Sequence, residues 1–194
     1  MPEISIVCGL GNPGQQYRKT RHNLGFMALD GLAERRSLKW RRGAGPTMEA
    51  IWRVGHSSVI LLKPLLFMNA SGVALARRPG VAAEELLVVC DDMSLPLGQL
   101  RLRKSGGSGG HKGLESVIGV LETEGFPRLR LGIGSPPDGT DWIDFVLADF
   151  APEERPAVDG MIDTAAEAIE AVLRGGLESA MTRYNRPGPV SGSS

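Results

Sequence analysis

One stretch of this 194-residue sequence joins a flexible backbone to side chains that can do acid–base chemistry. Residues 9–26 read GLGNPGQQYRKTRHNLGF and follow the apolar run 4–8, which predicts a buried strand. The stretch contains a glycine-dense turn, the amide Asn12 and the imidazole His22, where an apolar helical period begins. A strand end, a turn, an amide and a histidine so close in sequence predict a catalytic cradle.

His22 has the most distinctive chemistry in this stretch. An isolated histidine is more often structural than catalytic, but the surroundings of His22 favour catalysis. Thr20 or Arg21 is expected to cap a helix and to place His22 in its first turn, where the helix dipole disfavours the charged imidazolium. A neutral imidazole can take a proton from water. Asp91 or Asp92, which follow the apolar strand predicted at 86–90, could fix its tautomer.

Two glycine-rich patterns suggest other chemistry and are disfavoured. Residues 9–14 match the dinucleotide fingerprint G-x-G-x-x-G, but that motif needs a helix to open at once, and residues 15–20 have no apolar face. Residues 106–110 match the nucleophile elbow G-x-S-x-G, but the only histidine after Ser108 is His111, too near in sequence to serve it. The same run fails as a phosphate-binding loop. The histidines show no metal-ligand spacing, so no metal site is expected.

The alternation of strand and helix patterns predicts the fold class: α/β, a single-domain globule with a mixed, partly parallel β-sheet flanked by helices. Strands are expected near residues 4–8, 49–54, 59–62, 86–90, 99–103 and 129–133, the second and third forming an antiparallel hairpin. Helices are expected near residues 22–39, 68–78, 114–121, 152–174 and 177–184, and a basic loop at 41–46. One domain therefore spans residues 1–186, and the proline-, glycine- and serine-rich tail 187–194 is expected to be disordered.

Composition limits the partners of this protein. Its 22 basic and 22 acidic residues cancel, so a polyanion could bind only at a local basic patch. Cys8 and Cys90 lie in apolar runs and are expected to be buried, reduced thiols of an intracellular protein. The N-terminus lacks a signal-peptide pattern and no apolar run approaches ~18 residues. A soluble, cytoplasmic protein that does not span a membrane is therefore expected.

Four long motifs, in order along the chain, carry a family resemblance. They are GLGNPGQQYRKTRHNLGF (9–26), KPLLFMNASG (63–72), DDMSLPLGQLRLRKSGGSGGHKGLESV (91–117) and PRLRLGIG (127–134). Through them the chain resembles the bacterial peptidyl-tRNA hydrolases from about residue 4 to residue 185. The family has a single α/β globule with a mixed sheet. The resemblance implies a monomeric enzyme that hydrolyses the ester between a peptide's C-terminal carbonyl and the ribose of tRNA, with no metal or organic cofactor.

The same resemblance implies a role for each matching residue. His22 matches the general base that activates water, and Asp91 matches the carboxylate that orients it. Asn12 matches an amide that helps select peptidyl over free aminoacyl esters, and Asn69 an amide that binds the peptide backbone. The other matches are the residues that line the peptide cleft, Tyr17, Phe67 and Met68, and the tRNA-contacting residues that flank the glycine loop, Lys104 and Arg130.

Four residues depart from the family pattern. Lys112 stands where the family has an asparagine that helps hold substrate and water. The other departures are Cys90 for a histidine, Ser94 for an aspartate and Leu66 for a threonine. Lys112 touches the site most directly: its cation could contact a phosphate or the ester oxygen, or could leave a slow enzyme.

Two hypotheses of different class therefore stand. The first is an active esterase, favoured because the four principal site residues are present: His22, Asp91, Asn12 and Asn69. The second is a catalytically impaired RNA-binding relative of the same fold, which the departures at Lys112 and Ser94 keep open.

Overall fold

A seven-stranded mixed sheet forms the centre of the protein in a computed structural model that describes residues 4–78 and 80–185. The strands are β1 (Ile6–Gly9), β2 (Arg41–Arg42), β3 (Thr47–Val54), β4 (Ser57–Pro64), β5 (Leu86–Asp92), β6 (Leu100–Arg103) and β7 (Arg128–Gly132), in the spatial order β2-β3-β4-β1-β5-β7-β6. The central strands β4, β1, β5 and β7 run parallel, whereas β2, β3 and β6 are antiparallel to their neighbours. The predicted mixed α/β fold is confirmed.

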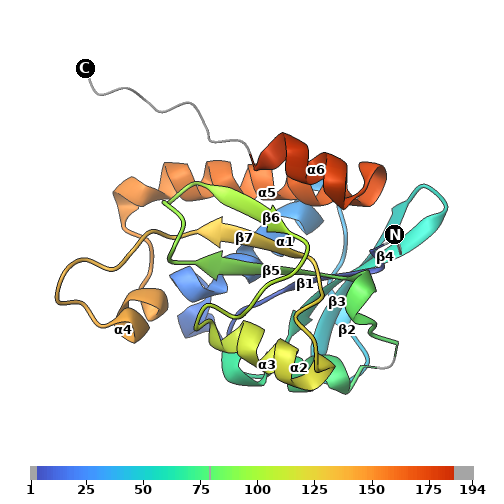
Figure 1. Cartoon of the computed structure of the whole chain (residues 1–194), viewed down its shortest axis with the longest axis horizontal. Coiled ribbons are helices and arrows are strands. Elements are labelled where there is room, and N and C mark those ends of the chain that lie inside the picture. Colours follow the sequence, from blue (N-terminus) through green and yellow to red (C-terminus); the bar gives the residue numbers. More distant parts are fainter. Residues whose placement is uncertain (1–3, 79, 186–194) are drawn as a thin grey trace.

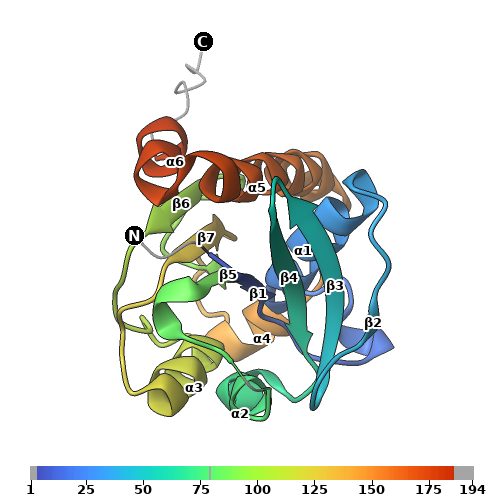
Figure 2. The same ribbon diagram turned by 90° about the vertical axis from the view of Figure 1, so that its right-hand side faces the viewer.

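Helices cover both faces of the sheet (Figure 1). Helices α1 (Leu24–Arg35), α5 (Arg155–Gly175) and α6 (Leu177–Tyr184) pack on one face, and α2 (Ser71–Ala76) and α3 (Lys112–Leu121) on the other, as Figure 2 also shows. Side chains alternate along a strand, so β1 contributes to the cores on both faces of the sheet. Val7 packs in the core under α1, α5 and α6, whereas Ile6 and Cys8 pack in the core under α2 and α3. The short helix α4 (Trp142–Leu147) lies beyond the ends of β5 and β7 (Figure 1).

Cys8 and Cys90 are both free and buried, as the sequence predicts. Burial raises the pKa of each thiol above its usual range, so both stay protonated and serve as small apolar side chains. Among the described residues, none of the helices combines the length and the apolar composition that a membrane span requires. The tail predicted to be disordered, residues 187–194, lies outside the described part of the chain.

Several predicted boundaries are corrected by the structure. The helix predicted at 22–39 is α1, which starts at Leu24 after a 3₁₀ turn, Arg21–Asn23, whose polar side chains are buried. His22 therefore precedes the helix, and the Thr20 side chain makes no capping bond. The basic loop predicted at 41–46 contains β2, which pairs with β3. Helix α4 is not predicted, because its six residues are too few to show a helical period.

A side chain satisfies backbone hydrogen-bonding groups on the free edge of strand β6. Asn185 follows α6, and its side-chain carbonyl accepts a hydrogen bond from the Leu102 N–H at 2.8 Å. Its amide group donates to the Leu102 carbonyl at 2.9 Å. The Asn185 amide thus takes the place of a neighbouring strand and ties α6 to the sheet.

Replacing Asn185 with alanine removes both hydrogen bonds and leaves the buried Leu102 backbone groups unpaired. We expect the free energy of unfolding to fall by about 1–3 kcal/mol, the usual cost of unsatisfied buried polar groups. Chemical denaturation of the variant beside the wild type measures this loss. Asn185→Asp keeps the acceptor but not the donor, so its stability should be intermediate. Equal stability of Asn185→Ala and wild type would contradict the role of this contact.

Candidate active site

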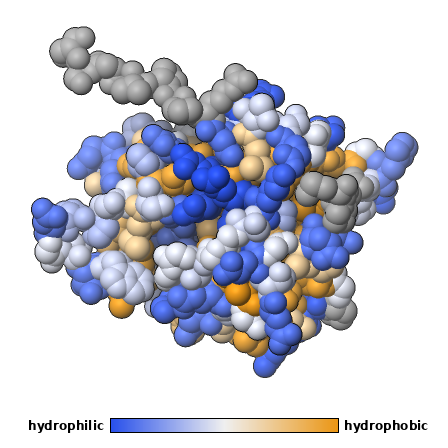
Figure 3. All heavy atoms as spheres, in the orientation of Figure 1, coloured by the Kyte–Doolittle hydropathy of each residue, from blue (hydrophilic) through white to orange (hydrophobic). Residues whose placement is uncertain are grey.

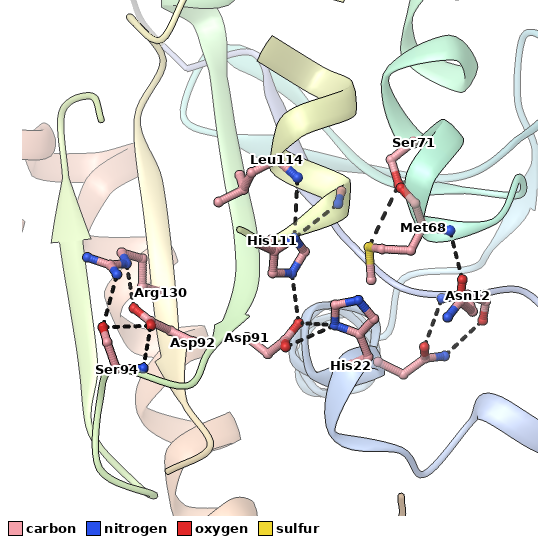
Figure 4. Close-up of polar contacts among 12 residues, drawn as sticks. Asn12, His22, Met68, Ser71, Asp91, Asp92, Ser94, His111, Leu114 and Arg130 are labelled. Atoms are coloured by element: carbon pink, nitrogen blue, oxygen red, sulfur yellow. Dashed lines mark hydrogen bonds and ion pairs between the residues drawn. The ribbon is translucent and has the colours of Figure 1, made fainter. Parts of the chain in front are cut away.

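Asp91, the penultimate residue of β5, contacts two histidines (Figure 4). Nδ1 of His22 lies 3.0 Å from each Asp91 carboxylate oxygen, and Nε2 of His111 lies 2.9 Å from one of them. The two imidazole rings are neighbours, with centroids 4.8 Å apart and planes tilted by 48°. Asp91 is 4 % exposed and His22 7 % exposed. Asp91, and not Asp92, is therefore the strand-end carboxylate that faces His22.

The hydrogen bonds assign the proton on each imidazole ring. His22 presents Nδ1 to a carboxylate, so this nitrogen donates and Nε2 is left with its lone pair. Nδ1 of His111 accepts from the backbone N–H groups of Gly113 and Leu114 at 3.1 and 3.2 Å, at the start of α3. The proton of His111 must therefore lie on Nε2, where it is donated to Asp91.

Asp91 remains ionised although it is buried. Burial favours the neutral carboxyl group, but the charge interactions and hydrogen bonds with His111 and His22 outweigh burial and hold the pKa of Asp91 well below its usual range. At neutral pH the cluster is a carboxylate between two imidazole donors. If Nε2 of His22 accepts a further proton, the negative charge of Asp91 would compensate the positive charge of the ring.

The turn that carries His22 lies in close backbone contact with the sheet. A Cβ atom on Gly25, at the start of α1, would lie 2.4 Å from the carbonyl oxygen of Val89 in β5. A Cβ atom on Gly9, at the end of β1, would lie 2.4 Å from the carbonyl oxygen of Gly25. Only glycine permits this approach at both positions, and the approach brings His22 within hydrogen-bonding distance of Asp91.

Arg21 ties the same turn to α4. Its side chain is buried and donates hydrogen bonds to the Asp149 carbonyl and to the Glu154 carboxylate, each at 2.7 Å. Its guanidinium carbon also lies 4.5 Å from the centroid of the Phe145 ring in α4. The residue before His22 therefore fixes the position of α4 relative to the cluster.

A chain of amides joins this turn to the segment before α2 (Figure 4). The Asn12 N–H donates to the Asn23 side-chain carbonyl at 2.8 Å, and the Asn23 amide donates back to the Asn12 carbonyl at 2.9 Å. The Asn12 side-chain oxygen accepts from the Met68 N–H at 2.7 Å. Asn69 follows in the 3₁₀ turn Met68–Ala70 and is exposed. The fold thus places Asn12 and Met68 in direct contact beside His22.

Two predicted cleft residues form an aromatic pair near these amides. The rings of Tyr17 and Phe67 meet edge to face, with centroids 6.3 Å apart and planes at 89°. Phe67 is 59 % exposed, although large apolar side chains are usually buried. Tyr17 is half-buried, so Phe67 is the exposed member of the pair.

The cluster opens into a cleft of about 660 Å³. Its lining residues include His22, Asp91 and His111, the α4 residues Trp142 and Val146, and Lys112 and Arg130. Arg130 is held in place by Asp92, whose carboxylate lies 2.5 Å from Nε, and by Ser94 Oγ at 3.2 Å from a terminal nitrogen (Figure 4).

The two lysines singled out by the sequence each pair with a carboxylate. The Lys112 ammonium lies 2.9 Å from the carboxylate of Glu115, three residues further along α3, and the Lys112 side chain is half exposed where it lines the cleft. Lys104 forms an ion pair with Glu178 of α6 and does not line the cleft. Of the residues predicted to contact tRNA, Arg130 therefore lines the cleft, and Lys104 lies outside it, next to α6.

Strands β6 and β7 present arginines on one face. Arg101 pairs with Arg130 and Arg103 with Arg128 across the antiparallel ladder, so all four point to the same side. Arg128 is buried and donates to two carbonyls, including Gly107 of the glycine loop at 3.0 Å. Arg103 is exposed and Arg101 half-buried. The deepest blue in Figure 3 lies over β6 and marks this hydrophilic surface.

His111 is the site residue that the sequence analysis missed. The sequence offers His111 only as a partner for Ser108 or as a metal ligand, and both are disfavoured, whereas in the structure it caps α3 and reaches Asp91. Its position between a glycine run and an apolar helix was the available signal, since such positions cap helices. The fold also gathers His22, Asp91 and His111 so that their possible metal-ligand atoms lie within 4.8 Å of one another, which sequence spacing alone did not suggest.

Asp91→Asn tests the carboxylate as the centre of the cluster. An amide would face two N–H donors with a single acceptor oxygen, so we expect the free energy of unfolding at pH 7 to fall by about 3 kcal/mol. Because the folded pKa of Asp91 is lowered, its stabilising effect is complete above the ordinary pKa of ~3.9 and is lost as pH falls further. Denaturation from pH 7 to pH 3 should show a constant gap to wild type above about pH 4 and a narrowing gap below it. Asp92→Asn is the control, and a gap that does not depend on pH would contradict the assignment.

Comparison with known proteins identifies the family. A family model described as peptidyl-tRNA hydrolase matches residues 6–191. The peptidyl-tRNA hydrolase of Chloroflexus aurantiacus is 44 % identical over 184 residues, covering 93 % of this chain and 98 % of the relative. That of Aquifex aeolicus is 43 % identical over 192 residues, covering 95 % and 97 %. The crystal structure of the Acinetobacter baumannii enzyme matches with a TM-score of 0.88 and 31 % identity, over 96 % of this chain and 97 % of that one. The chain belongs to the peptidyl-tRNA hydrolase family.

Proposed function

We propose that this protein releases peptides from peptidyl-tRNA by hydrolysing the ester between the peptide carbonyl and the tRNA ribose, with His22 as general base. The observation that carries the proposal is the buried pair of His22 and Asp91 at the cleft. Nδ1 of His22 is engaged by Asp91, and Nε2 has no hydrogen-bond partner within the described part of the chain. That nitrogen is therefore free to bind a water molecule.

The reaction requires one proton to move twice. Nε2 of His22 takes a proton from water as the water oxygen attacks the ester carbonyl carbon, and a tetrahedral intermediate forms. The C–O bond to the ribose then breaks, and His22 returns the proton to the leaving ribose oxygen. Asp91 keeps the ring oriented and balances the imidazolium charge between these steps. The products are a peptide carboxylic acid, which releases its remaining proton to solvent, and a tRNA with a free ribose hydroxyl.

The substrate would lie across the site with a defined direction. Asn12 and Asn69 offer amides to the peptide backbone, and the apolar side chains of Tyr17, Phe67 and Met68 lie beside them. Arg130 is on the other side of the His22 and Asp91 cluster (Figure 4), where a phosphate of tRNA could share it with Asp92. The peptide would therefore extend toward Asn12 and the tRNA toward Arg130.

We infer further that the enzyme acts as a cytoplasmic monomer. The substrate arises where translation occurs, which supports a cytoplasmic location. The three groups of the cluster, His22, Asp91 and His111, all come from one chain, so the proposed chemistry needs no partner subunit.

The proposal is tested by comparing release from an N-blocked aminoacyl-tRNA with release from the same aminoacyl-tRNA left unblocked. Selective release from the blocked ester supports a peptidyl-tRNA hydrolase. Binding of tRNA without release would instead support the alternative, a catalytically impaired RNA-binding relative. Hydrolysis of both esters at the same rate would contradict the role of Asn12 in selecting peptidyl over free aminoacyl esters.

His22→Ala should abolish turnover and leave tRNA binding nearly intact. Loss of a general base typically lowers the rate by ~10²–10⁴-fold, whereas His22 is buried and offers no phosphate contact. The measurements are single-turnover hydrolysis and tRNA binding by the purified variant. Hydrolysis near the wild-type rate would exclude His22 as the base.

Lys112→Asn should raise the chemical rate severalfold. An asparagine amide both donates and accepts hydrogen bonds, so it can hold water and a peptide group together, whereas a lysine ammonium only donates. Single-turnover hydrolysis of both forms measures the effect. Glu115→Gln, which frees the ammonium without removing it, is the matched control and should not raise the rate. A slower Lys112→Asn enzyme would mean that Lys112 takes part in catalysis.

Affinity for tRNA should fall as salt increases, and Arg130→Ala should flatten this dependence. Each phosphate contact contributes ~0.7–0.9 to the slope of log affinity against log salt. Lys104→Ala should also flatten the salt dependence if the Lys104 ammonium leaves Glu178 and pairs with a phosphate of bound tRNA. Arg53→Ala, an exposed change on β3, is the control. If the affinity of the wild type for tRNA does not change with salt concentration, the arginine face is excluded as the tRNA-binding surface.

A further inference from the structure

A second groove, separate from the catalytic cleft, lies beside α1. Its volume is about 650 Å³, close to that of the cleft, and among the described residues the two share no lining residue. One wall is the loop that contains Asn12 and Pro13, another is the exposed side of α1, and the far end is formed by Trp40 and Met48. We propose that this groove, called here the α1 groove, binds the part of the nascent peptide upstream of its C-terminal residue. The inference rests on the proposed function and extends it.

The α1 groove begins at the proposed peptide contacts. Asn12 lines it and also holds the Met68 N–H at 2.7 Å. On the opposite wall, Leu65 lies two residues before Phe67 of the aromatic pair. A chain that leaves the ester past Asn12 would therefore enter the groove, on the side away from Arg130.

The charges of the groove fit a peptide better than RNA. Within residues 4–78 and 80–185, its charged lining residues are two cations and two anions: Arg18, Lys63, Asp30 and Glu34. The Lys63 ammonium is already paired, 2.5 Å from Asp30, and lies 4.1 Å from the centroid of the Trp40 ring. A polyanion would find no net positive charge here, in contrast to the arginine face of β6 and β7.

The apolar lining suits a peptide of variable sequence. Phe26, Leu38 and Trp40 supply large apolar surfaces, and Met27 and Met48 supply unbranched side chains that adapt to different partners. A hydrolase that acts on interrupted translation products would need such tolerance. The backbone amides of the peptide would be held near Asn12, and its side chains would contact the adaptable surface.

The test compares two substrates that share one tRNA and one C-terminal amino acid, an N-acetyl-aminoacyl-tRNA and an N-acetylated hexapeptidyl-tRNA. The quantity measured is the ratio of kcat/KM for the long substrate to that for the short one. Trp40→Ala should lower this ratio about fivefold to tenfold, the scale of losing an aromatic contact from a binding surface. Met48→Ala should lower it in the same direction and serves if Trp40→Ala folds poorly. Ile51→Ala, on the exposed side of β3, should leave the ratio unchanged.

Each outcome separates the possibilities. A wild type that releases neither substrate would overturn the proposed function, and the groove assignment with it. A wild type active on both, whose ratio is unchanged in both groove variants, would overturn the α1 groove alone. Equal losses on the long and short substrates would also overturn it, because the groove would then contact the tRNA or support the fold.

Discussion

The buried carboxylate of Asp91 is the group on which the site depends. It joins three segments that are remote in sequence: the end of β5, the turn before α1 and the start of α3. A buried anion is stable only when hydrogen bonds replace its lost water. His22 and His111 provide these bonds, so the two loops that carry them are held where the parallel strands end. Ligands commonly bind at this edge of α/β sheets because loops converge there.

Two buried arginines support the loops from outside the cluster. Arg21 fastens the His22 turn to α4, and Arg128 donates to the Gly107 carbonyl of the glycine loop that leads to His111. A guanidinium group has several donors in a rigid plane, so one side chain can satisfy several backbone carbonyls at once. The glycine loop gains from the Arg128 contact an order that its own sequence does not impose.

The sequence predicted the framework more completely than the site. Apolar runs predict β1 and β5, and the end of β5 leaves Asp91 and Asp92 as two candidate partners for His22, of which the family resemblance selects Asp91. His111 was missed because its role depends on tertiary contact: no local pattern shows that a cap of α3 also reaches β5. The start of α1 was misplaced because Arg21, His22 and Asn23 turn inward to make long-range hydrogen bonds, which override local helical preference. Lys112 is a different case, since its pairing with Glu115 is local and follows from α3 starting at Lys112, two residues before the predicted start.

The two histidines around Asp91 look equivalent but differ in what they can do. Nδ1 of His111 accepts two backbone N–H groups of α3, so protonating it would break the helix cap and set a positive charge at a helix N-terminus, where the dipole repels it. Nε2 of His22 has no hydrogen-bond partner among the described residues, so protonating it breaks no contact. The added positive charge on the His22 ring would be compensated by Asp91. The asymmetry therefore comes from the backbone around each ring. It makes His111 a fixed donor that keeps Asp91 ionised, and it leaves His22 as the one member of the pair suited to exchange a proton with water.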